Sequence, residues 1–377
     1  MDQSNFDEKV ALLALVRTPG IGSVTIKQLI SYCGSARNIF AADYKRLIKV
    51  QGVGDKAARS LLKKENWAEA EKEWERCLKE QVTLTFYTDP EYPKRLKSLY
   101  DSPVMLYSKG QIDYNTQRTL GIVGTRKVTD YGKAVTETLI RELVPYAPLV
   151  VSGLAYGVDI TAHRACLKNN LATIGVMASG LDIIYPAVHA RTSVEMMSNG
   201  GIVTEAPLGT KPDFMRFPAR NRIIAGLSDV TVVIESASRG GSLITAEYAQ
   251  NYHRDVYAVP GNLGNPLSEG CNQLIRANKA SLFTSVDDLV QDLQWNLSQE
   301  TASSTEKPQV SPEELVFDGF TQEEGQVLSL LKSKGDMQID ELSWQSGIHM
   351  GKLATLLLNL EFQGMVRSLP GKKYALI

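Results

Sequence analysis

The chain has 377 residues, which is too long for one compact core and predicts two or three domains. With 41 Lys and Arg against 42 Asp and Glu, the net charge of −1 excludes an overall basic field, so any site for anions must be a local cluster. The four cysteines have neither zinc nor CxxC spacing, the acidic N-terminus does not resemble a signal peptide, and no apolar run approaches the ~20 residues that span a bilayer. We therefore expect a cytoplasmic protein with reduced cysteines and no membrane contact.

Residues 1–80 are predicted to be helical and contain two similar segments. "TPGIGSVTIKQLI" and "VQGVGDKAARSLL" each place an apolar-Gly-apolar-Gly turn before a helix. This resembles the helix-hairpin-helix motif, whose turn can offer backbone N–H groups to a DNA phosphate. The alternative is two helical hairpins packed for structure alone. The 14 Lys and Arg against 11 Asp and Glu in this region favour that alternative.

Residues 81–297 alternate short apolar strands with amphipathic helices. Several strands are apolar throughout, as expected for strands buried on both faces. The fold class is therefore α/β, with a Rossmann-like, doubly wound and mostly parallel sheet. The predicted strands are "VTLTFY", "TLGIVG", "PLVVSG", "ATIGVMA", "GGIVTE", "DVTVVIE" and "VYAVPG".

The remaining residues divide into a linker and a small domain. Residues 298–314 are polar, contain Pro and Ser, and lack an apolar period, which indicates a flexible linker. Residues 315–377 show helices followed by two strands around a Pro-Gly turn, a winged-helix pattern. Because this region has 6 Lys and Arg against 7 Asp and Glu, we favour a protein contact or structural role over the reading of DNA sequence.

The central domain lacks the motifs of the common cofactor sites. The first strand-helix turn, "GIVGTRKVTDYG", has no GxGxxG, the next strand carries no acid for a ribose, and no Walker loop occurs. We therefore expect no cofactor. The four histidines lack metal spacing, and for Asp159 and His163, which are i, i+4 on one helix, we expect a surface or capping role.

Five turns rich in small residues follow predicted strands. They are "GTRK", "SGLAYG", "ASGLD", "TEAPLG" and "SASRGGS". The carboxyl ends of parallel strands line one crevice, where helix N-termini favour anions. Arg126 and Arg239 add guanidinium groups suited to phosphate. Any one such turn is explained by tight packing, but five turns on one edge predict a ligand site.

A basic stretch with aromatic residues, "TKPDFMRFPARNR", precedes the last strands. Cations that follow phosphates and rings that stack on bases suit single-stranded nucleic acid. The alternative is that Phe214 and Phe217 pack in the core and Arg222 forms a structural ion pair. For the arginines as a group we favour an anion role.

Together these motifs resemble the DprA/Smf family of DNA-processing proteins. The resemblance runs from about residue 82 to 285 and rests on "GIVGTRKVTDYG", "VSGLAYGVDITAH", "ASGLDIIYP", "FPARNRIIAGLSDVTVVIESASRGGSLITAEYA" and "VPGN…GCNQLIR" in order. It implies a domain that binds single-stranded DNA, forms a homodimer and loads the RecA recombinase during natural transformation. The family usually has Asn where His189 stands, with Arg191 nearby as a possible source of charge.

The resulting hypothesis is a non-enzymatic protein that binds single-stranded DNA largely independently of sequence. The residues expected to contact DNA are Gly124, Thr125, Arg126, Ser152, Gly153, Lys211, Arg216, Phe217, Arg220, Asn221, Arg222, Arg239, Gly240, Gly241 and Ser242. Two alternatives remain, a nucleotide phosphoribohydrolase and a small-nucleotide sensor. "GGSLITAE" resembles the PGGxGTxxE loop of the former, with Glu247 as the assisting acid, but Ser242 and Leu243 depart from that motif.

Overall fold

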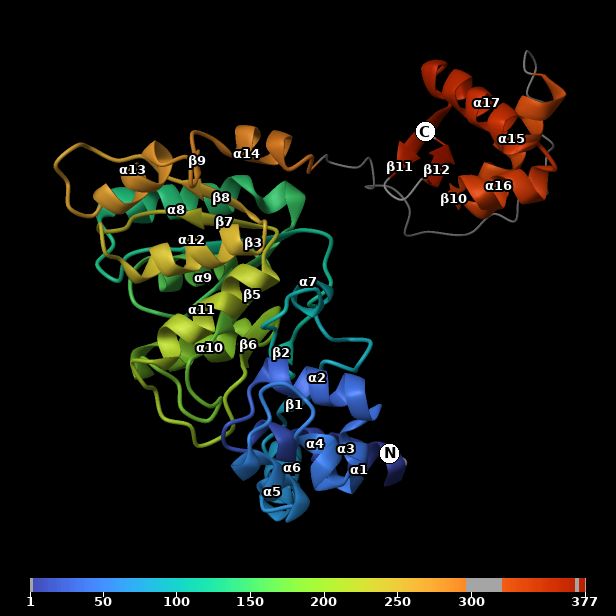
Figure 1. Cartoon of the computed structure of the whole chain (residues 1–377). Helices are drawn as coiled ribbons and strands as arrows, with labels where there is room; N and C mark the ends of the chain where they lie inside the picture. The colour runs from blue at the N-terminus through green and yellow to red at the C-terminus, as the bar shows by residue number, and fades with distance from the viewer. Residues whose placement is uncertain (1–2, 296–320, 370–372, 377) are drawn as a thin grey trace. The chain divides into compact units, whose positions relative to one another are not determined.

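A computed structural model describes residues 3–295, 321–369 and 373–376. The predicted linker at 298–314 and the Pro-Gly turn of the last hairpin lie outside these residues. The chain divides into two compact units, Met1–Glu300 and Thr301–Ile377, which we describe separately (Figure 1). Within the described residues, no helix has the length and apolar character that crossing a membrane would need.

The first unit begins with a helical region that contains both glycine turns. Gly20 has φ +81° before the second helix, and Gly52 has φ +87° before the fifth. Positive φ is where glycine is favoured, so these turns need the residues that the motif supplies. The second turn also packs tightly, since a Cβ on Gly52 would meet Thr25 Oγ1 at 2.8 Å. The helices are α1 (Gln3–Val16), α2 (Ser23–Cys33), α3 (Ala36–Ala41), α4 (Tyr44–Leu47), α5 (Asp55–Leu62) and α6 (Trp67–Lys79).

The central sheet of the described residues has the order β1-β2-β6-β5-β4-β3-β7-β8-β9. In this order, the strands β6, β5, β4, β3, β7, β8 and β9 are parallel to one another. Strand β2 pairs antiparallel with both β1 and β6. This confirms the predicted fold class. The strands are β1 (Thr83–Phe86), β2 (Met105–Gln111), β3 (Thr119–Val123), β4 (Leu149–Ser152), β5 (Thr173–Val176), β6 (Gly200–Thr204), β7 (Val230–Val233), β8 (Asp255–Ala258) and β9 (Ser281–Leu282).

All seven strands predicted from the sequence are present, and the prediction missed β2 and β9. β2 begins as the apolar run "MLY" and continues as "SKGQ", so it shows neither alternation nor a long buried run. β9 has two residues, both exposed. Such short or mixed edge segments carry little of the periodic signal on which strand prediction depends.

Helices cover both faces of the parallel strands, so the sheet lies between two apolar layers. One face packs against α11 (Arg216–Leu227), α12 (Gly241–Asn251) and α13 (Glu269–Arg276). The other packs against α8 (Asp130–Glu142), α9 (Val158–Lys168) and α14 (Val286–Asp292). Strand residues alternate between the layers: Leu120 and Ile122 enter the second, whereas Val123 enters the first.

The helical region is continuous with the sheet domain rather than separate from it. One apolar cluster joins α1–α6 to residues of β1, β2 and β6, and to Leu154, Leu181 and Leu208 beyond the strand ends. In Figure 1 the blue helices lie at the β1–β2 end of the sheet. Their position relative to the loops beyond β5 and β6 is therefore set by a shared core.

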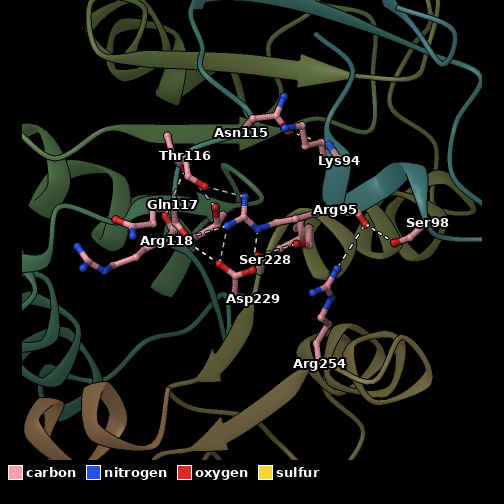
Figure 2. A network of polar contacts seen from close by, with 12 residues as sticks. Lys94, Arg95, Ser98, Asn115, Thr116, Gln117, Arg118, Ser228, Asp229 and Arg254 are labelled. Carbon is pink, nitrogen blue, oxygen red and sulfur yellow. Dashed lines mark hydrogen bonds and ion pairs between the residues drawn. The ribbon is translucent and has the colours of Figure 1, made fainter. Parts of the chain in front are cut away.

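A polar network fastens the segment that carries α7 (Lys94–Lys97) to the amino ends of β3 and β7. The Arg95 guanidinium donates to both Asp229 carboxylate oxygens at 2.7 and 2.8 Å, and to the Thr116 and Gln117 carbonyls at 2.9 and 3.1 Å. Figure 2 shows this arrangement, in which Arg254 also reaches the Arg95 carbonyl at 3.4 Å. The network lies at the edge opposite to the carboxyl ends of the strands.

The second unit has the winged-helix order. Its helices are α15 (Gln322–Lys334), α16 (Ile339–Ser346) and α17 (Met350–Phe362), with strands β10 (Met337–Gln338), β11 (Val366–Leu369) and β12 (Lys373–Leu376). β12 lies between β10 and β11 in an antiparallel sheet. Thr321 and Glu324 form a capping box at the start of α15. The predicted winged-helix domain is thus confirmed.

His163 makes folding stability depend on pH. The side chain is 0 % exposed, its Nδ1 lies 2.7 Å from the Thr173 hydroxyl, and burial lowers its pKa from 6.5 to about 3. The surface or capping position expected for His163 is therefore wrong, because α9 packs this residue against the sheet. Below pH 6.5 the unfolded chain takes up a proton that the folded state does not, so stability present above pH 6.5 falls as the pH falls. At about pH 5 the loss should be about 2 kcal/mol.

Urea unfolding between about pH 4 and 7 measures this dependence. His163→Gln removes the titrating group, and its stability should vary with pH by about 1.4 kcal/mol per pH unit less than the wild type does. Parallel pH profiles for the two proteins would show that His163 does not carry the effect.

Candidate functional site

A cleft of 650 Å³ opens at the carboxyl ends of the central strands. Along the chain the strand order runs from β3 outward to β6, and then β7 begins again on the other side of β3. The loops after β3 and β7 therefore diverge, which leaves a crevice at the point where open α/β sheets bind ligands. The cleft is lined by these two loops, by the start of α12 and by one side of α11.

A cationic and aromatic pair stands at one wall of the cleft. The Arg126 guanidinium carbon lies 5.2 Å from the centre of the Phe217 ring, within cation–π distance. Tyr185 packs beside Phe217 with its ring centre 5.8 Å away and is 45 % exposed. Arg126 is itself exposed. The wall thus presents a positive charge and two ring faces together.

The opposite wall is the "SRGGS" turn at the start of α12. The Gly240 N–H donates to the Ala237 carbonyl at 2.9 Å, so the amides left open are those of Gly241 and Ser242, the first two of the helix. A Cβ on Gly240 would lie 2.2 Å from Ser236 Oγ, which explains the glycine. Arg239 is exposed, and no described residue forms an ion pair or hydrogen bond with its guanidinium. Open amides, a helix N-terminus and an arginine together favour an anion.

The floor of the cleft holds two buried groups of opposite charge, Arg220 and Asp159. Arg220 and Asp159 are each 6 % exposed. Arg220 Nη1 donates to the Gly153 carbonyl at 2.6 Å and to the Val176 carbonyl, while Asp159 accepts the Gly153 amide at 3.1 Å. Burial lowers the pKa of Arg220 to about 10 and raises the pKa of Asp159. A Cβ on Gly153 would lie 2.5 Å from Arg220 Nη1, so only glycine fits there.

Three of the residues expected to contact DNA are buried beneath the cleft. Ser152 is 0 % exposed and its hydroxyl donates to the Ile122 carbonyl at 2.6 Å. Gly153 is buried beneath Arg220, whose guanidinium is directed at carbonyl groups of the protein. Ser152, Gly153 and Arg220 therefore support the cleft from within, although the Nε of Arg220 has no acceptor among the described residues.

The basic residues of the stretch "TKPDFMRFPARNR" do not all face the cleft, because the stretch ends within α11. Arg222 forms an ion pair with Glu205 and leaves only 14 % of its side chain exposed, so the structural alternative holds for this residue. Lys211 and Arg216 are exposed beside the cleft without lining it. Asn221 lines the cleft and donates to the Gly241 carbonyl at 3.3 Å. Helix α11 thus directs Arg222 away from the cleft.

Two aromatic residues of the cleft were absent from the expected set. Phe214 is 85 % exposed and, like Tyr185, lines the cleft. Neither Phe214 nor Phe217 lies in the core, so the packing alternative is wrong for both. Phe214 lies in the basic stretch, so the sequence could have indicated it as a cleft residue. Tyr185 follows the "ASGLD" turn, and its distance of 32 residues from Phe217 in the chain gave no signal of their contact.

Glu247, His189 and Arg191 do not line the cleft. Glu247 is exposed on α12. His189 is 3 % exposed, with Nδ1 2.8 Å from the Leu154 carbonyl, and Arg191 pairs with Glu195 at 2.9 Å. Asp159 is buried and accepts the Gly153 and Ala155 amides of the loop before α9, so the surface or capping role predicted for it is wrong.

Three regions of the chain match models of known families. The model described as DNA recombination-mediator protein A matches residues 83–294. The DprA winged helix domain matches residues 306–372, and a SAM-like helix-hairpin-helix tandem matches residues 12–64. The first match alone spans more than half of the chain.

Characterised relatives and solved structures agree with these matches. Protein Smf from Synechocystis sp. is 35% identical over 290 residues, covering 76% of this chain and 73% of the relative. The X-ray structure of DNA processing protein A from Streptococcus pneumoniae is similar with a TM-score of 0.65 and 31% identity, over 75% of this chain and 97% of that one. A Helicobacter pylori DNA processing protein A, whose structure concerns its single-stranded DNA binding mode, has a TM-score of 0.52 and 32% identity, over 57% of this chain and 96% of that one.

Proposed function

Because this chain belongs to the DNA recombination-mediator protein A family, also called DprA/Smf, we propose that its cleft binds single-stranded DNA. The binding is largely independent of sequence, and the protein carries out no catalytic step. One arrangement carries the proposal: Arg126 with aromatic rings on one wall, and Arg239 with the Gly241 and Ser242 amides on the other. The Helicobacter pylori relative supports the choice of ligand.

The cleft offers separate groups for the phosphates and for the bases of a DNA strand. Arginine and open helix amides contact phosphate oxygens, which are the same in every nucleotide. Phe214, Phe217 and Tyr185 offer ring faces on which unpaired bases stack, and stacking tolerates any base. A duplex keeps its bases stacked on each other, so it can use only the phosphate contacts. The arrangement therefore favours single strands without reading sequence.

Titration of labelled oligonucleotides tests this proposal. We expect tighter binding of single strands than of the matching duplex, with log Kd depending on log salt by a slope of about 0.7 for each phosphate neutralised. Poly-dT and mixed-sequence strands should bind alike. Equal affinity for the duplex, or binding that is unaffected by salt, would contradict the proposal. Release of free base from nucleoside monophosphates would instead favour the phosphoribohydrolase.

Two further parts of the proposal concern partners. We propose that the protein forms a homodimer through its Rossmann-like domain and loads the RecA recombinase onto the bound strand. Both parts rest on family membership alone. The mass in solution by light scattering, against 41.5 kDa for one chain, checks the first. The lag before RecA filaments form on single-stranded DNA, with and without the protein, checks the second.

A further inference from the structure

A short turn after β6 connects the helical region to the edge of the cleft. Residues 207–210, here called the anchor turn, close with the Thr210 amide on the Pro207 carbonyl at 3.2 Å. Gly209 has φ +80°, a conformation that favours glycine. The Gly180 amide donates to the Thr210 carbonyl at 2.9 Å, which ties the turn to the loop after β5.

Two carboxylates hold consecutive amides of the anchor turn. Glu73 of α6 accepts the Leu208 amide at 2.9 Å, and Asp182 accepts the Gly209 amide at 2.9 Å. α6 also supplies Arg76, whose Nη2 donates to Asp182 at 2.9 Å. Glu73 is 6 % exposed with Arg17 at 3.7 Å. The helical region therefore holds this turn through one direct and one relayed contact.

The segment that follows has few attachments of its own. Residues 211–215, here called the strap, lead from the anchor turn to α11 and include Pro212 and Phe214 of the cleft. Their hydrogen bonds are local: the Met215 amide donates to Asp213 Oδ1 at 2.8 Å and the Arg216 amide to the Asp213 carbonyl at 3.0 Å. No hydrogen bond or ion pair joins the strap to another part of the described chain. Its position is therefore set at its two ends, by the anchor turn and by α11.

We propose that α6 of the helical region positions the strap for DNA binding through Glu73, Arg76 and Asp182. The inference rests on the proposed function and gives the helical region a role that needs no DNA contact of its own. If the strap is ordered before DNA binds, less conformational entropy is lost on binding. Glu73, Arg76 and Asp182 are positioning residues, since none of them lines the cleft.

Asp182→Ala separates positioning from charge. Removing an acid makes the surface more positive, so electrostatics alone would strengthen DNA binding. The positioning role requires the opposite, a Kd for single-stranded DNA that rises about fivefold or more. The salt slope should stay unchanged, because no phosphate contact is lost. Without DNA, hydrogen exchange at Leu208 and Gly209 should become faster.

Matched variants complete the test. Arg76→Ala should also raise the Kd for single-stranded DNA. Because the Arg76 side chain is 42 % exposed, the variant should still fold. Asp55→Ala removes the same charge from an exposed pair on α5, Arg59 and Asp55 at 2.9 Å. It should not weaken DNA binding and should leave strap exchange unchanged. Unchanged or tighter binding by folded Asp182→Ala and Arg76→Ala would overturn the inference while the proposed function stands. A wild-type protein that binds no single-stranded DNA would end both.

Discussion

Replacing Arg126 and Arg239 together with alanine is expected to raise the Kd for single-stranded DNA by about a hundredfold. Each exposed guanidinium can make a charge-assisted contact with a phosphate worth about 1.5 kcal/mol, and 1.4 kcal/mol is a tenfold change. The two stand on opposite walls of one cleft, so one strand can contact both. The log–log salt slope should fall by about 1.4, for two phosphates no longer neutralised.

The double variant should fold like the wild type, because both side chains are exposed. Arg141→Ala/Lys168→Ala is the matched control: it removes two charges from the last turns of α8 and α9, which lead away from the cleft. Fluorescence anisotropy at several salt concentrations measures both proteins. If the Arg126/Arg239 variant binds as tightly as the wild type, the cleft is not the DNA-binding site. If the control loses as much affinity, the loss reflects only the change in net charge.

Much of the frame of this site could be predicted from sequence. Strands such as "TLGIVG" and "DVTVVIE" are mostly apolar and lead into turns of small residues, which indicates parallel strands and a ligand edge. Arg126 and Arg239 follow those strands directly. Since the switch point lies between β3 and β7, the topology alone brings the two arginines to one crevice.

The direction of side chains within α11 could not be predicted in this way. Arg216, Arg220 and Arg222 lie within seven residues, and composition treats them alike. The helix turns Arg220 inward to backbone carbonyls near Asp159 and Arg222 toward Glu205, whereas Arg216 stays exposed. Asp159 belongs to α9 and Glu205 follows β6, so these orientations depend on tertiary contacts. Gly240 was expected to contact DNA, but its amide closes a turn on the Ala237 carbonyl.

Arg220→Met is expected to destabilise the fold by about 3–5 kcal/mol, because it removes one of two neighbouring buried charges of opposite sign. The cost arises mainly from what remains. Asp159 would keep its place at 6 % exposure without the opposite charge, and the Gly153 and Val176 carbonyls would lose their donor. Urea unfolding of the two proteins at pH 7 measures the difference.

The pH dependence of that difference identifies the cause. Burial already raises the pKa of Asp159, with Arg220 opposing this effect, so loss of the arginine raises it further. A carboxyl group whose pKa is raised in the folded state stabilises the fold below its unfolded pKa, and this stability is lost as the pH rises through the folded pKa. The cost of Arg220→Met should therefore be smaller at about pH 5 than at pH 7. Adding Asp159→Asn should restore part of the stability lost at pH 7 and remove this pH dependence. If Arg220→Met costs less than about 1 kcal/mol at every pH, water reaches Asp159 and replaces the arginine.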